Sequence, residues 1–237
     1  MVVELKCYPL EEFPVCYPKE NCDFRKELRK AGVECVYSIG KREFKKFRFL
    51  GIGFRGVVFL AKWNNIKVAI KVPRTDYLYD MRKEALIQKM AYPIAPKVFE
   101  YSRSFIIMEY VPYPDISERI SEPLPALKEV LRKVLDAAFT LDMKGIDHGE
   151  LVRPWKHVLV GERAVILDYG SASLERKPSN LTSIVSGLLM KPSPPASEIA
   201  RKMGINKAEL VEALKLYKKN PSEDTYRIVL MKAHLLC

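Results

Sequence analysis

The chain has 237 residues and a formal net charge of +11, with 40 Lys and Arg against 29 Asp and Glu. Its length fits one large domain or two small ones, and a hydrophobic content of 48% excludes a wholly disordered chain. No stretch of about 18 uninterrupted apolar residues is present, so we expect no membrane-spanning helix. The first residues have none of the segments of a secretory signal, and we expect a cytoplasmic protein.

The composition also gives expectations about the growth temperature of the source organism and about the binding partners of the chain. Gln88 is the only glutamine, whereas Lys, Arg and Glu are abundant. Few thermolabile amides and many ion-pairing side chains predict a thermophilic source. The basic excess favours anionic partners such as nucleotides, nucleic acid or acidic proteins. The basic residues are spread along the chain, so a solvated surface is the plainer interpretation.

Four of the five cysteines lie in the first 35 residues. Their spacings match no common zinc pattern. Disulfides are unusual in the cytosol, although hyperthermophiles are an exception. We therefore expect buried free thiols first, one or two disulfides second and a zinc site third. The cysteines are Cys7, Cys16, Cys22, Cys35 and Cys237.

The first half of the chain is rich in predicted strands. The expected elements are a helix over 23–31, strands over 57–61 and 66–72, a helix over 77–90 and a strand over 105–108. Asn64 and Asn65 separate the first two strands, which predicts a β-hairpin. Thr75 or Asp76 is the expected N-cap of the second helix.

The pattern becomes mainly helical after Pro114. Apolar residues at helical spacing predict a long helix over 124–144, which Gly145 ends. Two short apolar runs around a Gly-Glu-Arg turn, 158–160 and 165–167, predict a second hairpin. From Leu181 onward we expect helices, with a proline-rich break at 192–195.

Gly51, Gly53 and Gly56 form a Gly-x-Gly-x-x-Gly turn that Val58 follows. In a dinucleotide-binding fold, a helix would open at the last glycine and bind the pyrophosphate at its N-terminus. Here strand residues follow, and the Gly-Lys-Ser/Thr of a P-loop is absent. A glycine-rich turn between two strands instead predicts a flexible loop that covers the phosphates of ATP.

Lys71 lies fifteen residues after Gly56, near the end of the second apolar strand after this turn. We expect its ammonium group to point into the same cleft and hold phosphates, although most strand-end lysines are simply solvated. A lysine in an apolar cleft needs an anionic partner to keep its charge. Glu84 lies in the middle of the next predicted helix and is the preferred partner, while Asp80 and Glu100 remain alternatives.

Two further motifs lie in the second half. Asp168 ends a buried strand and is followed by Tyr169 and Gly170, and its carboxylate suits Mg²⁺ that bridges phosphates. Such turns are also common in unrelated proteins. Upstream, His148 and Glu150 belong to a His-Gly-Glu-Leu segment. We expect His148 to be a packed structural histidine.

Four motifs between about Phe47 and Asn180, in their order along the chain, resemble those of the protein kinase superfamily. They are the glycine-rich turn, the Val-Ala-Ile-Lys strand, the His-x-acid-Leu segment and the Asp-aromatic-Gly turn. The subgroup that the chain resembles most is the predicted Ser/Thr kinases of archaea, relatives of the RIO-type and similar atypical kinases. The resemblance implies an α+β, two-lobed fold with a short activation segment. Its parts are a Cys-containing extension over 1–36, a β-rich N-lobe over 37–111 and a helical C-lobe over 112–237.

The resemblance also implies ATP-dependent phosphoryl transfer to Ser or Thr of a protein, with Mg²⁺ or Mn²⁺. Glu150 would accept the hydroxyl proton and Asp168 would bind the metal. Met108 would be the gatekeeper, and the backbone of Glu109 and Val111 would face the adenine. The implied nucleotide-binding residues are Gly51, Gly53, Gly56, Val58, Lys71, Glu84, Glu109 and Val111.

Three departures from the kinase pattern are visible. Glu150 stands where the family has an aspartate, and Trp155 stands where it has the asparagine that binds a second metal. A two-residue insertion would align His157 with that asparagine, and a histidine suits Mg²⁺ poorly. Only a few residues separate Gly170 from Asn180, which leaves no room for a regulated activation segment.

Other functions therefore stay open. One is a small-molecule kinase of the aminoglycoside or choline type, and another is a nucleotide-binding pseudokinase or scaffold. Residues 196–237 resemble a helix-turn-helix around Gly204, and Lys202, Lys207 and Lys215 would then contact nucleic acid. The plainer interpretation, which we favour, is two helices of the C-lobe joined at a glycine.

Overall fold

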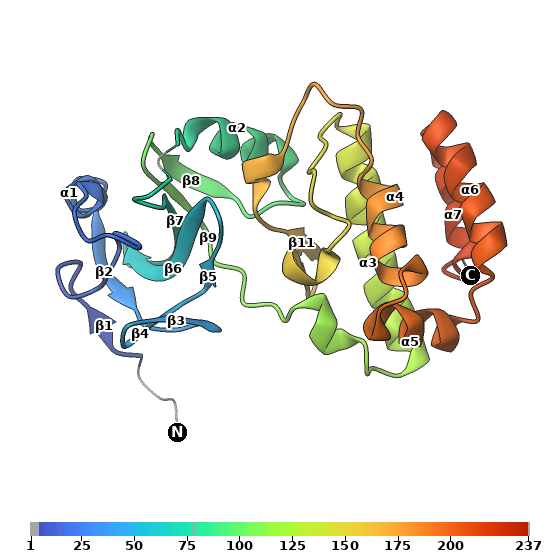
Figure 1. Cartoon of the computed structure of the whole chain (residues 1–237), viewed down its shortest axis with the longest axis horizontal. Helices are drawn as coiled ribbons and strands as arrows, with labels where there is room; N and C mark the ends of the chain where they lie inside the picture. Colours follow the sequence, from blue (N-terminus) through green and yellow to red (C-terminus); the bar gives the residue numbers. More distant parts are fainter. Residues whose placement is uncertain (1–4, 78, 237) are drawn as a thin grey trace. The chain divides into compact units, whose positions relative to one another are not determined.

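The computed structural model describes residues 5–77 and 79–236, so Cys237 lies outside the described residues. The chain divides into two compact units, Met1–Lys89 with Pro96–Tyr110 and Met90–Ala95 with Val111–Cys237. The first unit is built on an antiparallel sheet, and the second is mostly helical (Figure 1). The α+β class predicted from the sequence is confirmed.

A seven-stranded sheet forms the first unit, in the order β1-β2-β6-β7-β9-β8, with β5 paired to β6. Its neighbouring strands are antiparallel. Its strands are β1 (Cys7–Tyr8), β2 (Val33–Tyr37), β5 (Gly51–Ile52), β6 (Gly56–Trp63), β7 (Ile66–Pro73), β8 (Val98–Tyr101) and β9 (Ile106–Glu109). A separate hairpin consists of β3 (Arg42–Phe44) and β4 (Phe47–Phe49). The first 37 residues thus add two strands, β1 and β2, to the sheet.

The hairpin of β6 and β7 forms as predicted from its sequence. Asn64 and Asn65 connect the strands with φ angles of 47° and 62°. Asparagine tolerates this left-handed region, and two such residues in succession match the twist of the flanking strands. The register pairs Val58 with Lys71, which places the end of β7 beside the start of β6.

One face of the sheet packs against the N-terminal segment and α1 (Phe24–Lys30). The helix confirms the prediction over 23–31. Phe13 lies in this core, with its ring centroid 4.9 Å from that of Phe49 and 5.5 Å from that of Phe59. These aromatic contacts join the N-terminal segment to the sheet.

The helix α2 (Arg82–Ala91) packs against the other face. The predicted start at residue 77, with Thr75 or Asp76 as N-cap, is wrong. The helix begins at Arg82, whose backbone N–H donates to Asp80 Oδ1 at 3.0 Å. The side chains of Thr75 and Asp76 instead bind a backbone amide and a guanidinium elsewhere, so they are not at a helix end.

The cysteines of the N-terminal segment form two disulfides, Cys7–Cys35 and Cys16–Cys22. The expectation of free thiols is therefore wrong. Because β1 pairs with β2, the Cα atoms of Cys7 and Cys35 lie 5.6 Å apart, within the usual range for a disulfide. Disulfides are typical of oxidising compartments, with hyperthermophile cytosol as an exception. The pairing fits a secreted or extracellular location better than the cytoplasm that we expect from the sequence.

The second unit is built around α3 (Leu124–Met143), which confirms the long helix predicted there. Gly145 follows it with a φ of +71°, the left-handed conformation of a helix C-cap. The predicted hairpin is also present, as β10 (Val158–Val160) and β11 (Ala164–Ile166). Short 3₁₀ turns cover Ile116–Arg119, Pro154–Lys156 and Tyr169–Ser171.

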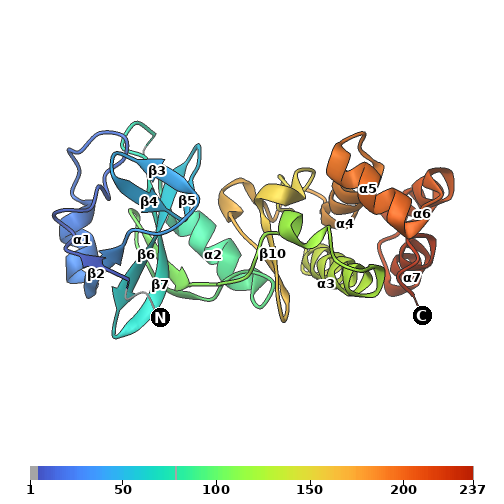
Figure 2. The ribbon, with the colours of Figure 1, turned by 90° about the horizontal axis from the view of Figure 1, so that it is seen from below.

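The remaining helices confirm the predicted helical C-terminal region. They are α4 (Asn180–Val185), a π-helical turn over Ser186–Met190, α5 (Pro194–Met203), α6 (Lys207–Lys219) and α7 (Glu223–Lys232). Gly204 separates α5 from α6 with a φ of +64°, and α6 and α7 lie side by side (Figure 2). Lys202 and Lys207 donate to carbonyl oxygens of Ile120 and Met190. Among the described residues, no helix has the length and apolar character needed to cross a membrane.

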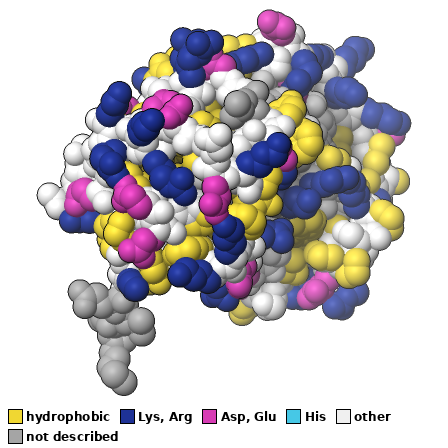
Figure 3. Space-filling model, turned by 60° about the vertical axis from the view of Figure 1, so that its left-hand side comes forward, with side chains coloured by type: hydrophobic (Ala, Val, Ile, Leu, Met, Phe, Trp, Pro, Cys, Tyr) yellow, Lys and Arg dark blue, Asp and Glu magenta, His cyan; other side chains and the backbone are white. Residues whose placement is uncertain are grey.

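The basic residues are not gathered into a single patch on the face that Figure 3 shows. Dark blue Lys and Arg side chains are spread over that face, with fewer magenta Asp and Glu side chains among them. Mixed charge of this kind is typical of a solvated surface.

Candidate functional site

The alternation of side chains along β7 places Lys71 beneath α2. Val68, Ile70 and Val72 face the core with α1, so Ala69 and Lys71 face the core with α2. Lys71 Nζ lies 2.5 Å from Glu84 Oε1, and these side chains are only 6% and 2% exposed. Glu84, the predicted partner of Lys71, thus contacts it.

Glu84 is held from a second direction by Tyr79, whose hydroxyl donates to Glu84 Oε2. Glu84 lies on the buried face of α2 with Ala85, and Met81, just before the helix, packs in the same core as Ala85. Desolvation of two charges costs several kcal/mol per ion, and apolar side chains of similar size often replace buried pairs without loss of stability. Packing alone gives little reason for a buried ammonium group at this position.

The glycine-rich turn lies directly against Lys71. Gly51 is on β5, and the Gly53 N–H donates to Gly56 O at 2.9 Å, which closes the turn. A Cβ atom at Gly56 would lie 2.5 Å from Val72 O and 3.4 Å from Lys71 Cε. Only glycine therefore fits at position 56, and the turn and the ammonium group form one local site.

Other predicted residues of the nucleotide site lie near this turn or at the end of β9. Val58 packs in the core with α2, on the same face as Lys71. Met108 is buried, and its sulfur accepts from Gln88 Nε2 at 3.2 Å. The Glu109 N–H donates to Lys97 O at 2.8 Å within the sheet. Val111 is buried and belongs to the second unit.

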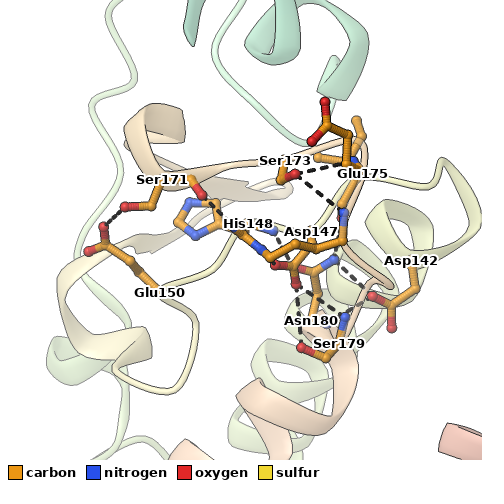
Figure 4. Close-up of polar contacts among 11 residues, drawn as sticks. Asp142, Asp147, His148, Glu150, Ser171, Ser173, Glu175, Ser179 and Asn180 are labelled. Carbon is orange, nitrogen blue, oxygen red and sulfur yellow. Dashed lines mark hydrogen bonds and ion pairs between the residues drawn. The ribbon is translucent and has the colours of Figure 1, made fainter.

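In the second unit, hydrogen bonds and an ion pair connect the segment 147–150 to the residues that follow Asp168. Asp147 and Ser173 exchange backbone hydrogen bonds of 2.9 and 2.8 Å. The Asp147 carboxylate accepts from Arg176 Nε at 2.7 Å and from the Ser179 N–H at 3.3 Å (Figure 4). These contacts hold residues 147–150 against the residues that follow Asp168.

Hydrogen bonds to Asn180, and through it to Asp142, also hold the segment 147–150 in place. The His148 N–H donates to Asn180 Oδ1 at 2.9 Å, and Asn180 Nδ2 donates to Asp142 Oδ1 at 2.8 Å. Tyr217 donates to the other Asp142 oxygen at 2.8 Å. Burial raises the pKa of Asp142, and these donors oppose the rise. Sequence reasoning missed this network, because its members lie far apart along the chain.

His148 is fully buried, as expected for a structural histidine. Its Nε2 atom lies 3.0 Å from Leu167 O, so the neutral ring donates there. Burial and, to a smaller extent, the nearby His157 lower the pKa of His148 to about 4. Its ring also packs edge-on against Tyr169 of the Asp-Tyr-Gly turn. His148 thus fixes this turn relative to Glu150.

Glu150 lies between two polar side chains. Its Oε1 atom accepts from the Ser171 hydroxyl, and its Oε2 atom lies 3.4 Å from His157 Nε2. The Glu150 side chain is 41% exposed, whereas that of His157 is 8% exposed. Burial lowers the pKa of His157, so the ring is neutral near pH 7. Ser171 was not predicted; its position just after Asp-Tyr-Gly was the available signal.

Asp168 is exposed and caps the 3₁₀ turn that follows, since the Gly170 N–H donates to Asp168 Oδ1 at 3.4 Å. Its φ of 69° is left-handed, a conformation that aspartate tolerates better than most residues. No group of three His, Cys, Asp or Glu side chains that could hold a metal occurs in the part of the chain described by the structure. The exposed carboxylate of Asp168 is nevertheless of the kind that Mg²⁺ takes as an oxygen ligand together with phosphates.

A comparison with models of known protein families finds none that matches the chain.

The close approach at Gly56 gives a stability prediction. Gly56→Ala should lower the free energy of unfolding by about 1–3 kcal/mol, because its Cβ atom would overlap a backbone oxygen. Gly51→Ala is the matched control, because its nearest neighbours would lie at 3.9 Å, and we expect a change within about 0.5 kcal/mol. Urea unfolding measures both values. Equal stability of the two variants would contradict the close packing of this turn.

The buried His148 gives a pH prediction. Its folded pKa of about 4 lies below the ordinary value of 6.5, so the unfolded chain binds the proton first as the pH falls. His148 should therefore lower stability by about 3 kcal/mol between pH 6.5 and pH 4, at about 1.4 kcal/mol per pH unit. Urea unfolding of metal-free protein should show a shallower loss in His148→Gln, while the exposed His234→Gln keeps the wild-type slope. The same slope in all three proteins would show that His148 is not buried and neutral.

Proposed function

We propose that the chain is an atypical ATP-dependent protein kinase that transfers the γ-phosphoryl group to Ser or Thr. Its first unit would correspond to a kinase N-lobe and its second to a C-lobe with a short activation segment. The observation that carries the proposal is the buried ion pair of Lys71 and Glu84 against the glycine-rich turn. This arrangement keeps a cation beside a turn whose backbone is closely approachable, which suits phosphate groups.

Each side chain of the first unit has a distinct task in this proposal. Lys71 neutralises phosphate charge, and Glu84 keeps the ammonium group charged and directed. The glycines let backbone N–H groups approach the phosphate oxygens. Such reactions depend mainly on positioning and on charge stabilisation.

The second unit supplies the groups that act on the acceptor. Glu150 accepts the hydroxyl proton, and Asp168 would hold Mg²⁺, with His157 as a further ligand. When bound, the metal supplies positive charge that offsets the charge of the phosphates. The neutral imidazole of His157 suits Mn²⁺ better than Mg²⁺. A glutamate in place of an aspartate retains the base and displaces it, so we expect slow transfer.

The Glu150 variant separates a kinase from a nucleotide-binding pseudokinase. Glu150→Gln should lower transfer from γ-labelled ATP to a basic model protein at least about tenfold, since positioned proton acceptors typically contribute more than that. Its ATP affinity in calorimetry should stay near that of the wild type. We also expect Mn²⁺ to support transfer at least as well as Mg²⁺.

Glu162→Gln is the matched control, because Glu162 is an exposed carboxylate of the same unit on the turn between β10 and β11. It should transfer as the wild type does. Equal transfer by Glu150→Gln and the wild type would exclude Glu150 as the base. ATP binding without transfer in any protein would favour the pseudokinase.

A further inference from the structure

The hydroxyl group of Ser171 contacts the carboxylate of Glu150, the proposed base. Ser171 donates to Glu150 Oε1, and Figure 4 shows the two side chains pointing toward each other. Ser171 is the last residue of the 3₁₀ turn that begins after Asp168. The carboxylate that would take a proton from an acceptor hydroxyl is therefore in contact with one from its own chain.

The backbone of Ser171 is held independently of this hydroxyl. Ser171 O accepts from Arg176 Nη2 at 2.7 Å, and the same guanidinium donates to Asp147 through Nε at 2.7 Å. The turn is also capped by Asp168. The position of Ser171 thus needs no hydroxyl contact to Glu150.

A nearby serine provides a contrast. Ser173 is buried, and its hydroxyl oxygen accepts the backbone N–H groups of Glu175 and Arg176 at 3.1 and 3.3 Å. It closes a turn, and Figure 4 draws no hydrogen bond between Ser173 and Glu150. Ser171, by contrast, directs its proton at a carboxylate that is 41% exposed. Water can satisfy such a carboxylate, so the contact contributes little stability.

We propose that Ser171 is a phosphoacceptor, and that the chain phosphorylates it within the same molecule. This inference rests on the proposed function. The bond between Ser171 Oγ and the γ-phosphorus of ATP forms while the bond from that phosphorus to the β,γ-bridging oxygen breaks. ADP leaves with the electron pair of the broken bond, and the hydroxyl proton passes to Glu150 Oε1.

Neighbouring charges favour the product and limit further reaction. The Arg176 side chain is 52% exposed and already contacts the Ser171 carbonyl, so it offers a guanidinium to a phosphoserine at this position. The phosphate would also repel the Glu150 carboxylate. Phosphorylation of Ser171 therefore moves the base away from its present contact and slows later transfer.

The test is incubation of the purified full chain with γ-labelled ATP and Mg²⁺ or Mn²⁺, followed by tandem mass spectrometry. We expect one phosphate at position 171, at a rate per molecule that does not depend on protein concentration. Ser171→Ala should lose at least about nine-tenths of this label, while Ser173→Ala keeps it. Ser171→Thr should carry a phosphate at the same position. Hydroxylamine should not release the label, because a phosphoester resists it and an acyl phosphate does not.

A basic model protein in the same reaction separates the possible failures. Label on the model protein without label at position 171 overturns this inference and leaves the proposed function intact. The same holds for hydroxylamine-labile label on the chain, or label that Ser171→Ala retains. If neither protein is labelled although the chain is folded, the proposed function fails and the inference fails with it.

Discussion

The burial of Lys71 together with Glu84 is the constraint on which the rest of the first unit depends. Two charges removed from water cost free energy that packing does not require, and this cost supports our proposal that the ammonium group is used for its charge. Side chains alternate between the two faces of the sheet along β7, so Lys71 points toward α2. Glu84 lies on the face of α2 that packs against the sheet. Gly56 then leaves space for the turn to lie against Lys71. Sheet, helix and turn thus converge on one cation.

The second unit divides its carboxylates into two kinds. Asp142 and Asp147 are buried and accept several hydrogen bonds each, and they fix the segment 147–150 against α4 and the residues after Asp168. Asp168 and Glu150 are at least partly exposed, and they lie on that fixed frame. A rigid frame with accessible carboxylates is suited to holding a metal or accepting a proton without large reorganisation.

Local patterns in the sequence predicted much of this fold, because their causes are local. The Asn64–Asn65 turn follows from backbone preferences, and the Lys71–Glu84 pair follows from the periods of a strand and a helix. Contacts between distant residues were not predictable in this way. The disulfide of Cys7 depends on how β1 meets β2, and the bond from Asn180 to Asp142 joins residues 38 positions apart.

The most direct test of the central claim is calorimetric titration of Mg²⁺-ATP into the wild type and the double variant Lys71→Met/Glu84→Gln. The double variant removes both charges and should keep its stability within about 2 kcal/mol, because no buried charge is left unpaired. Lys67→Met alters an exposed lysine of the same strand and should bind as the wild type does. We expect the double variant to be folded and to lose ATP affinity at least about tenfold, which is the effect of roughly 1.4 kcal/mol. Undiminished affinity in a folded double variant would contradict the assignment of this ion pair to phosphate binding.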